Sequence, residues 1–209
     1  HSVEDLHLKV DLNEFRSIIQ GRPALFVANH QTAMESLAFC ILGAYLVEHP
    51  VSGVAKEEHR NTDFGHFIEN SINPNGSYRP LIYVDRESPN ALLNMKEVFC
   101  EHLRSKKSLL LHVDGTRSTS SGQGIQNMSG MWFDIAEESE ALMIPVGFSG
   151  GIDAWEKNRR DIPRYRQHIV VGMPLDIAGM TIREKKEIVK KSIEILYVPS
   201  LGRKNNVTN

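Results

Sequence analysis

The chain has 209 residues, with 24 Lys plus Arg against 26 Asp plus Glu and a formal net charge of −2. This length fits one domain with a full core, and a 41% share of hydrophobic residues is ordinary for a globular protein. The lack of a basic excess argues against a nucleic-acid binder. Two cysteines are too few for a disulfide scaffold, which favours a reducing, cytoplasmic compartment. The longest strongly apolar run, 37–47, is shorter than the roughly 20 residues that a membrane-spanning helix needs, although peripheral membrane contact stays open.

Short, uniformly apolar segments alternate with longer amphipathic ones. The expected strands are 24–28, 51–55, 81–85, 108–113, 143–148 and 168–172, and the expected helices are 33–48, 91–105, 131–140 and 182–196. Apolar strands separated by helices predict an α/β fold, a single layered domain whose mostly parallel mixed sheet is flanked by helices. We expect this domain to cover 1–209, with 200–209 as a frayed tail, and we also consider that it was excised from a larger protein.

A first candidate for chemistry lies in the turn between the first apolar strand and the first helix. His30 occupies this turn, and Glu35 lies one helical turn further on. A carboxylate at this spacing can hydrogen-bond the imidazole, fix its tautomer and raise its basicity, so that the neutral histidine takes a proton from a hydroxyl. The spacing alone is a weak signal, because the chain has nine histidines and His30 could equally be a capping or packing residue.

A second candidate follows the strand at 108–113, which ends in the sequence DGTRS. Gly115 would let the backbone approach a ligand closely, and Thr116 and Arg117 would suit a phosphate. Another arginine, Arg86, follows the strand at 81–85. Each arginine alone could be a surface ion-pair residue, but the ends of parallel strands share one edge of a sheet, so we expect the two to lie together.

These motifs, in this order, resemble those of the glycerol-3-phosphate and lysophospholipid acyltransferase superfamily. The matches are Asn29, His30 and Glu35 for Asn-His-x4-Asp, 83–86 for a strand ending in Asp-Arg, 114–118 for Glu-Gly-Thr-Arg-Ser, 144–146 for an apolar-Pro-Val strand and 172–174 for a closing Gly-x-Pro. The resemblance covers roughly residues 20 to 180, and the first four of these short motifs, in this order, are more specific than any one of them.

The resemblance implies acyl transfer from acyl-CoA or an acyl-carrier protein to a glycerol-phosphate or lysophospholipid-like acceptor, without a metal or prosthetic group. His30 would then be the general base and Glu35 the residue that orients it. Arg86, Gly115, Thr116 and Arg117 would bind the acceptor phosphate, with support from Asn29, Asp114 and Ser118. The implied partners are the thioester donor and a membrane that the protein contacts peripherally; no nucleic acid is implied.

Other functions stay open. The family motifs have Asp where this chain has Glu35, and Glu where it has Asp114. Both substitutions keep the negative charge, but they leave room for a different alcohol or an amine as the acceptor. A second possibility is a non-catalytic domain that binds an acyl-carrier protein or lipid. A third is a hydrolase that uses His112 with Asp114, which would face the same way if both lay on one strand, although no Gly-x-Ser-x-Gly elbow accompanies them.

Overall fold

The structure, a computed structural model, describes residues 5–8, 11–72, 78–115, 117, 125, 127–151 and 167–197. The strands are β1 (Asp5–Leu8), β2 (Ala24–Ala28), β3 (Val51–Lys56), β4 (Leu81–Val84), β5 (Ser108–His112), β6 (Leu142–Ser149) and β7 (His168–Val171). The helices are α1 (Leu12–Ile19), α2 (Ala33–Val47), the 3-10 helix η1 (Glu57–His59), α3 (Asp63–Ile72), α4 (Ala91–Arg104), α5 (Met131–Glu138) and α7 (Ile182–Leu196).

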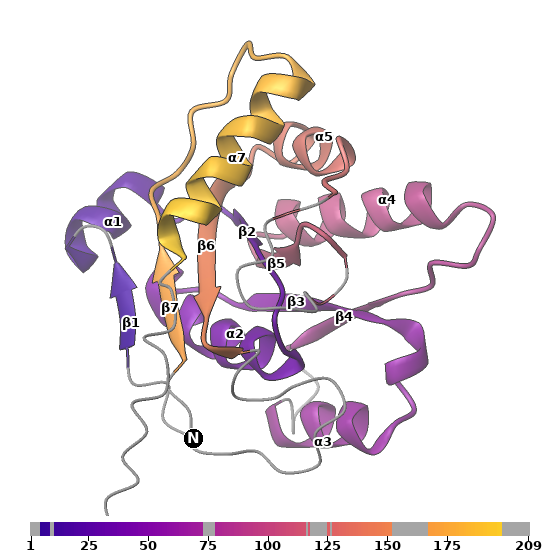
Figure 1. Cartoon of the computed structure of the whole chain (residues 1–209). Helices are drawn as coiled ribbons and strands as arrows, with labels where there is room; N and C mark the ends of the chain where they lie inside the picture. The colour runs from indigo at the N-terminus through magenta and orange to yellow at the C-terminus, as the bar shows by residue number, and fades with distance from the viewer. Residues whose placement is uncertain are drawn as a thin grey trace, which may run out of the picture.

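The strands form a single sheet in the order β1-β7-β6-β2-β5-β3-β4. Every neighbouring pair is parallel except β6 and β7, which are antiparallel, so β1 and β7 run opposite to the other five strands. The predicted α/β class with a mostly parallel mixed sheet is therefore confirmed. The carboxyl ends of β2, β4, β5 and β6 all lie at the same edge of this sheet (Figure 1).

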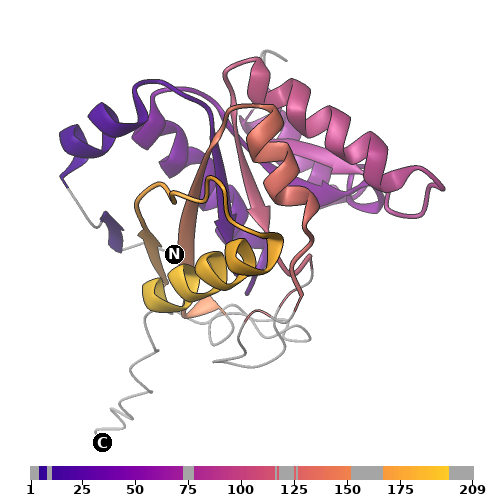
Figure 2. The same ribbon diagram turned by 90° about the horizontal axis from the view of Figure 1, so that it is seen from above.

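Helices cover both faces of the sheet, and side-chain alternation along the strands fills both layers. In β2, Leu25 and Val27 pack toward α4, α5 and α7, while Phe26 packs toward α1 and α2. All five residues of β2 and of β5 are buried, which explains why β2 is apolar throughout and why β5 is polar only at its two end residues, Ser108 and His112. Figure 1 shows α4, α5 and α7 on one side of the sheet and α2 on the other, and Figure 2 shows α7 lying across the strands that it covers.

All six expected strands and all four expected helices are present, with ends that differ by at most two residues from the expected ones. The elements β1, α1, η1 and α3 were not predicted. One difference concerns the strand expected at 108–113: β5 ends at His112, and the chain then turns, with Gly115 N–H donating to the His112 carbonyl at 3.0 Å and Gly115 at a φ of 66°. A positive φ is the conformation that glycine adopts without strain. The expected tail at 200–209 lies outside the described residues.

Candidate active site

The sequence places polar side chains just beyond the carboxyl ends of neighbouring parallel strands. His30 follows β2, Arg117 follows β5 and Arg86 follows β4. β2 and β5 are hydrogen-bonded neighbours, whereas β4 lies two strands beyond β5. Sheet edges of this kind, at the carboxyl ends of the strands, are the usual place for ligand sites in α/β folds.

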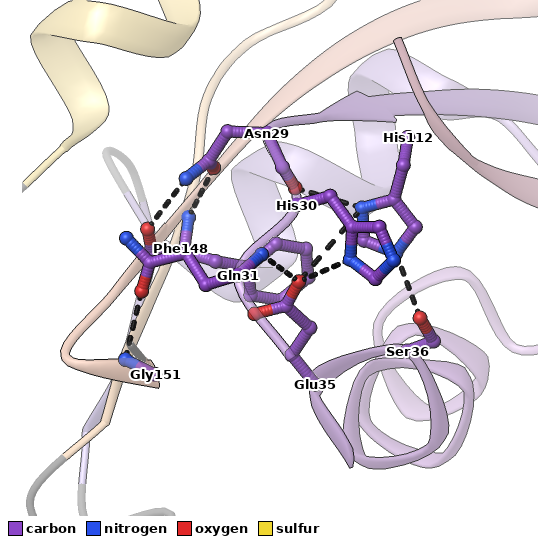
Figure 3. A network of polar contacts seen from close by, with 8 residues as sticks. All are labelled: Asn29, His30, Gln31, Glu35, Ser36, His112, Phe148 and Gly151. Carbon is purple, nitrogen blue, oxygen red and sulfur yellow. Dashed lines mark hydrogen bonds and ion pairs between the residues drawn. The ribbon is translucent and has the colours of Figure 1, made fainter. Parts of the chain in front are cut away.

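His30 and Glu35 form a hydrogen-bonded pair at this edge (Figure 3). The Nδ1 atom of His30 lies 2.8 Å from Oε1 of Glu35, a hydrogen-bonding distance. The same carboxylate oxygen accepts a hydrogen bond from the backbone N–H of Gln31 at 2.6 Å. Glu35 lies in the first turn of α2 and its side chain is 2% exposed, whereas that of His30 is 18% exposed. The acid of the pair is therefore held inside the protein, whereas the imidazole remains accessible from outside.

Burial keeps the imidazole neutral. Desolvation, followed by the positive charges of Arg117 and Arg86, lowers the pKa of His30 from 6.5 to about 3. Desolvation raises the pKa of Glu35 from 4.5 to about 7, although His112 and the backbone N–H groups of Gln31 and Thr32 act in the opposite direction. When Glu35 is ionised, its oxygen accepts the Nδ1 proton of His30, which leaves the Nε2 lone pair to take a proton.

The side chains of Asn29 and Gln31 attach the turn that contains His30 to the end of β6. The Nδ2 atom of Asn29 donates to the carbonyl of Phe148 at 2.8 Å, and the N–H of Phe148 donates to Oδ1 of Asn29 at 2.8 Å. Oε1 of Gln31 accepts from the N–H of Gly151 at 2.7 Å. Asn29 thus continues the β2–β6 hydrogen bonding one residue beyond the strand, which gives the turn a defined course (Figure 3).

A second histidine, His112, which the sequence suggested only for a hydrolase and not beside His30, lies against the first. The rings of His112 and His30 stack at a centroid distance of 3.8 Å and an interplanar angle of 23°. Nδ1 of His112 lies 2.7 Å from the carbonyl oxygen of Asn29, and Nε2 lies 2.7 Å from Oγ of Ser36. The available signal was a single ionisable residue at the end of the otherwise apolar run 109–113, on the strand that pairs with β2.

The expected phosphate-binding residues are only partly described. Arg86 and Arg117 are exposed, and both are close enough to His30 to lower its pKa by their charge. Nη1 of Arg86 donates to the carbonyl of Gly115 at 2.9 Å, which brings the end of β4 to the loop after β5. Asp114 accepts from the N–H of Asn127 at 3.0 Å and so orders the base of that loop. Thr116 and Ser118 lie outside the described residues.

Among the described residues, the only three-residue group of potential metal ligands is His30, Glu35 and His112. A metal ion binds an imidazole nitrogen in the plane of its ring, at about 2.0 to 2.1 Å. The rings of His30 and His112 are stacked face to face, so their lone pairs do not converge on a common point. Both nitrogens of His112 also have hydrogen-bond partners. The arrangement fits proton transfer better than metal binding.

Residues 9–149 match the acyltransferase family, so the chain belongs to this family of enzymes. The matched range includes His30, Glu35, Arg86 and the loop after β5. The chain is also similar to the crystal structure of the 1-acyl-sn-glycerophosphate (LPA) acyltransferase PlsC from Thermotoga maritima, with a TM-score of 0.62 and 20% identity over 92% of this chain and 72% of that one. At this identity the likeness shows the fold. No curated protein matches the sequence.

Within the described ranges, no helix has the length and apolar character needed to cross a bilayer.

Proposed function

We propose that the protein transfers a fatty acyl group from a thioester donor, acyl-CoA or an acyl-carrier protein, to a hydroxyl of a glycerol-phosphate or lysophospholipid-like acceptor, with His30 as the general base. The observation that carries this proposal is the 2.8 Å contact between His30 and Glu35 beside two exposed arginines, in a chain of the acyltransferase family. A base of this kind needs a neutral imidazole with one nitrogen held by an acid and the other left for the substrate.

The reaction follows from these groups. Nε2 of His30 removes the proton of the acceptor hydroxyl as its oxygen attacks the thioester carbonyl. The tetrahedral intermediate collapses with cleavage of the carbon–sulfur bond, and the departing thiolate receives the proton from the imidazolium. Glu35 accepts the hydrogen bond from the Nδ1–H of His30 throughout and stabilises the imidazolium. The scheme uses no metal or prosthetic group.

The two arginines would hold the acceptor phosphate. Their guanidinium groups offer several donors each, and charge-assisted bonds to phosphate are strong. Arg86 is already directed at the loop after β5 by its bond to Gly115, which brings it toward Arg117. Two positive charges beside His30 also keep it neutral, so acceptor binding and base function depend on the same charges.

Two alternatives receive less support from the geometry. A non-catalytic domain would not need an acid that orients His30, yet the carboxylate of Glu35 contacts this histidine even though its side chain is one methylene longer than the Asp of the motif. For the hydrolase alternative, β5 ends at His112 and Asp114 lies in the following turn, so the two do not share a strand face as expected. Both ring nitrogens of His112 have partners, Asn29 and Ser36, which leaves neither for a water nucleophile.

The decisive experiment incubates the protein with palmitoyl-CoA or palmitoyl-acyl-carrier protein against a panel of acceptors, read by mass spectrometry. The panel contains glycerol 3-phosphate, 1-acyl-glycerol 3-phosphate presented in vesicles, and matched alcohols and amines without phosphate. The proposal predicts an ester product on a phosphate-bearing acceptor, with one thiol released per ester. Product only on unphosphorylated acceptors would reject the acceptor class, and thioester hydrolysis or no turnover across the panel would reject acyl transfer.

A further inference from the structure

His112 joins the two segments that carry the proposed base and its orienting acid. Its Nδ1 contacts the carbonyl of Asn29, the residue immediately before His30, and its Nε2 contacts the hydroxyl of Ser36, the residue immediately after Glu35. His112 itself lies at the end of β5, at the same register as Ala28 of β2. Three separate elements, the β2–α2 turn, α2 and β5, therefore meet at this one imidazole (Figure 3).

The hydrogen-bond partners determine the protonation of His112. A carbonyl only accepts, so Nδ1 of His112 carries the proton that bonds to Asn29. The neutral ring then presents a lone pair at Nε2, to which the Ser36 hydroxyl donates. Burial, together with the adjacent His30, lowers the pKa of His112 to about 3, so the neutral form with these two bonds is the form at neutral pH.

The position of the ring restricts His30. It covers one face of the His30 imidazole at 3.8 Å, and its Nδ1 lies 3.9 Å from the Glu35 oxygen that binds His30. The side chain of His112 is 8% exposed. A ring held at both nitrogens cannot rotate without breaking a buried hydrogen bond, so the surface on which His30 rests is fixed.

We propose that His112 is a positioning residue: tied to Asn29 and Ser36, it sets the spacing between His30 and Glu35 and holds His30 as the single tautomer that has Nε2 free for the acceptor proton. This inference rests on the proposed role of His30 as the base. His112 acts through His30 and Glu35 and transfers no proton itself. Its contribution lies in the geometry of the pair, since a misplacement of about 1 Å can lower turnover roughly 100-fold.

Two variants separate the hydrogen bonds from the packing. His112→Phe keeps an aromatic ring against His30 and removes both hydrogen bonds, and Ser36→Ala removes only the bond to Nε2. The matched controls lie outside the site. Ser139→Ala deletes another buried serine hydroxyl, which bonds to the Ile135 carbonyl, and His102→Phe deletes another histidine, which contacts the Ser108 carbonyl.

The first measurement needs no substrate. Nitrogen NMR of ¹⁵N-histidine-labelled protein at pH 7.5, with His30 assigned by comparison with His30→Ala, reports which ring nitrogen carries the proton. We expect one tautomer, protonated at Nδ1, in the wild type and in both controls. We expect averaging between the two tautomers in His112→Phe and, to a smaller degree, in Ser36→Ala. A His30 signal that is unchanged in both variants would overturn the proposal, and Ser36→Ala carries the test if His112→Phe does not fold.

The second measurement is kinetic, with palmitoyl-CoA and the acceptor on which product is found. We expect kcat to fall about 10- to 100-fold in His112→Phe, with both KM values within about threefold of the wild type. The controls should keep kcat even if they lower thermal stability. Wild-type kcat in His112→Phe together with inactive His30→Ala would reject the role of His112 alone. An active, folded His30→Ala would instead reject the proposed base.

Discussion

At the scale of single residues, the site depends on three buried or half-buried ionisable groups kept in defined protonation states. His30 and His112 are neutral because burial lowers the pKa of each, and Glu35, whose pKa burial raises to about 7, is partly ionised at neutral pH. Clusters of this kind are typical of functional sites. They lower the stability of the folded protein, because groups that ionise readily in water are held where charge is disfavoured. The predictions at this scale follow from removing one charge at a time.

Glu35→Gln should lower kcat by about two to four orders of magnitude, because a neutral amide stabilises the imidazolium far less than a carboxylate. The pH profile provides a sharper test. The pKa of Glu35 is raised to about 7, so kcat/KM of the wild type should fall as the pH drops below about 7 and the carboxylate takes up a proton. This limb should disappear in Glu35→Gln and persist in Glu35→Asp. The same limb in Glu35→Gln would show that another group produces it.

Arg86→Ala and Arg117→Ala should each raise the acceptor KM at least about tenfold and leave the donor KM nearly unchanged, because charge-assisted contacts to phosphate would be lost. Both charges lower the pKa of His30, so each variant should also raise that pKa in an NMR titration. Arg104→Ala is the control, since Arg104 is exposed but bonds to the Glu138 carbonyl on α5. An acceptor KM that is unmoved in both folded site variants would indicate an uncharged acceptor.

At the scale of elements, the β2–α2 turn is the segment that positions His30 next to Glu35 at the end of β2. Asn29→Ala should destabilise the protein by about 2 kcal/mol, because it removes two hydrogen bonds and leaves the N–H and carbonyl of Phe148 without that partner. Urea unfolding measures the loss, with Asn94→Ala on the exposed face of α4 as the control. A loss no larger than that of the control would mean that the turn is held by other contacts.

The elements that the sequence predicts are those whose residues reveal burial locally. β2 is apolar at every position, β5 has three consecutive leucines at its centre, and helix α4 has a regular apolar stripe that ends in the buried residues Phe99 and Leu103. The missed elements lack such signals. Helix α1 buries only two side chains, whereas the equally short α5 buries four, and β1 is an edge strand whose partner β7 begins more than 150 residues later. Pairing at that distance leaves no periodic pattern within a short window.

The contacts within the site also differ in how far apart their residues lie in the sequence. His30 and Glu35 are five residues apart, on the β2–α2 turn and the first turn of α2, so the local course of the chain brings them together and their contact could be predicted. The partners of His112 are 83 and 76 residues away in sequence, at Asn29 and Ser36. Their contact depends on β2 and β5 being neighbours, and the strand order becomes known only from the fold.

At the scale of the whole molecule, the buried histidines link folding stability to pH. Below pH 6.5 the unfolded chain protonates a histidine that the native state keeps neutral down to about pH 3, so stability falls as the pH falls through this window. Glu35 acts in the opposite sense: its raised pKa means that the native state holds its proton more firmly between pH 4.5 and about 7, which offsets part of the loss.

His112→Phe isolates one of these contributions. From pH 7 to pH 5 each buried histidine should cost about 2 kcal/mol of unfolding free energy, so the variant should lose about 2 kcal/mol less than the wild type over this interval. Urea unfolding at both pH values measures this difference, and His66→Gln, at an exposed position in α3, serves as the control. Equal pH dependence in wild type and His112→Phe would mean that His112 takes up its proton over the same pH range in the native and unfolded states.

The central claim is that the imidazole of His30 removes the acceptor proton. The most direct measurement is the single-turnover rate of ester formation by His30→Ala with palmitoyl-CoA and the acceptor found active, beside the wild type and an exposed-histidine control, His59→Ala. We predict a rate about two to four orders of magnitude below the wild type, with a native circular dichroism spectrum and unchanged His59→Ala activity. A folded His30→Ala protein that forms ester at a rate near that of the wild type would contradict the account.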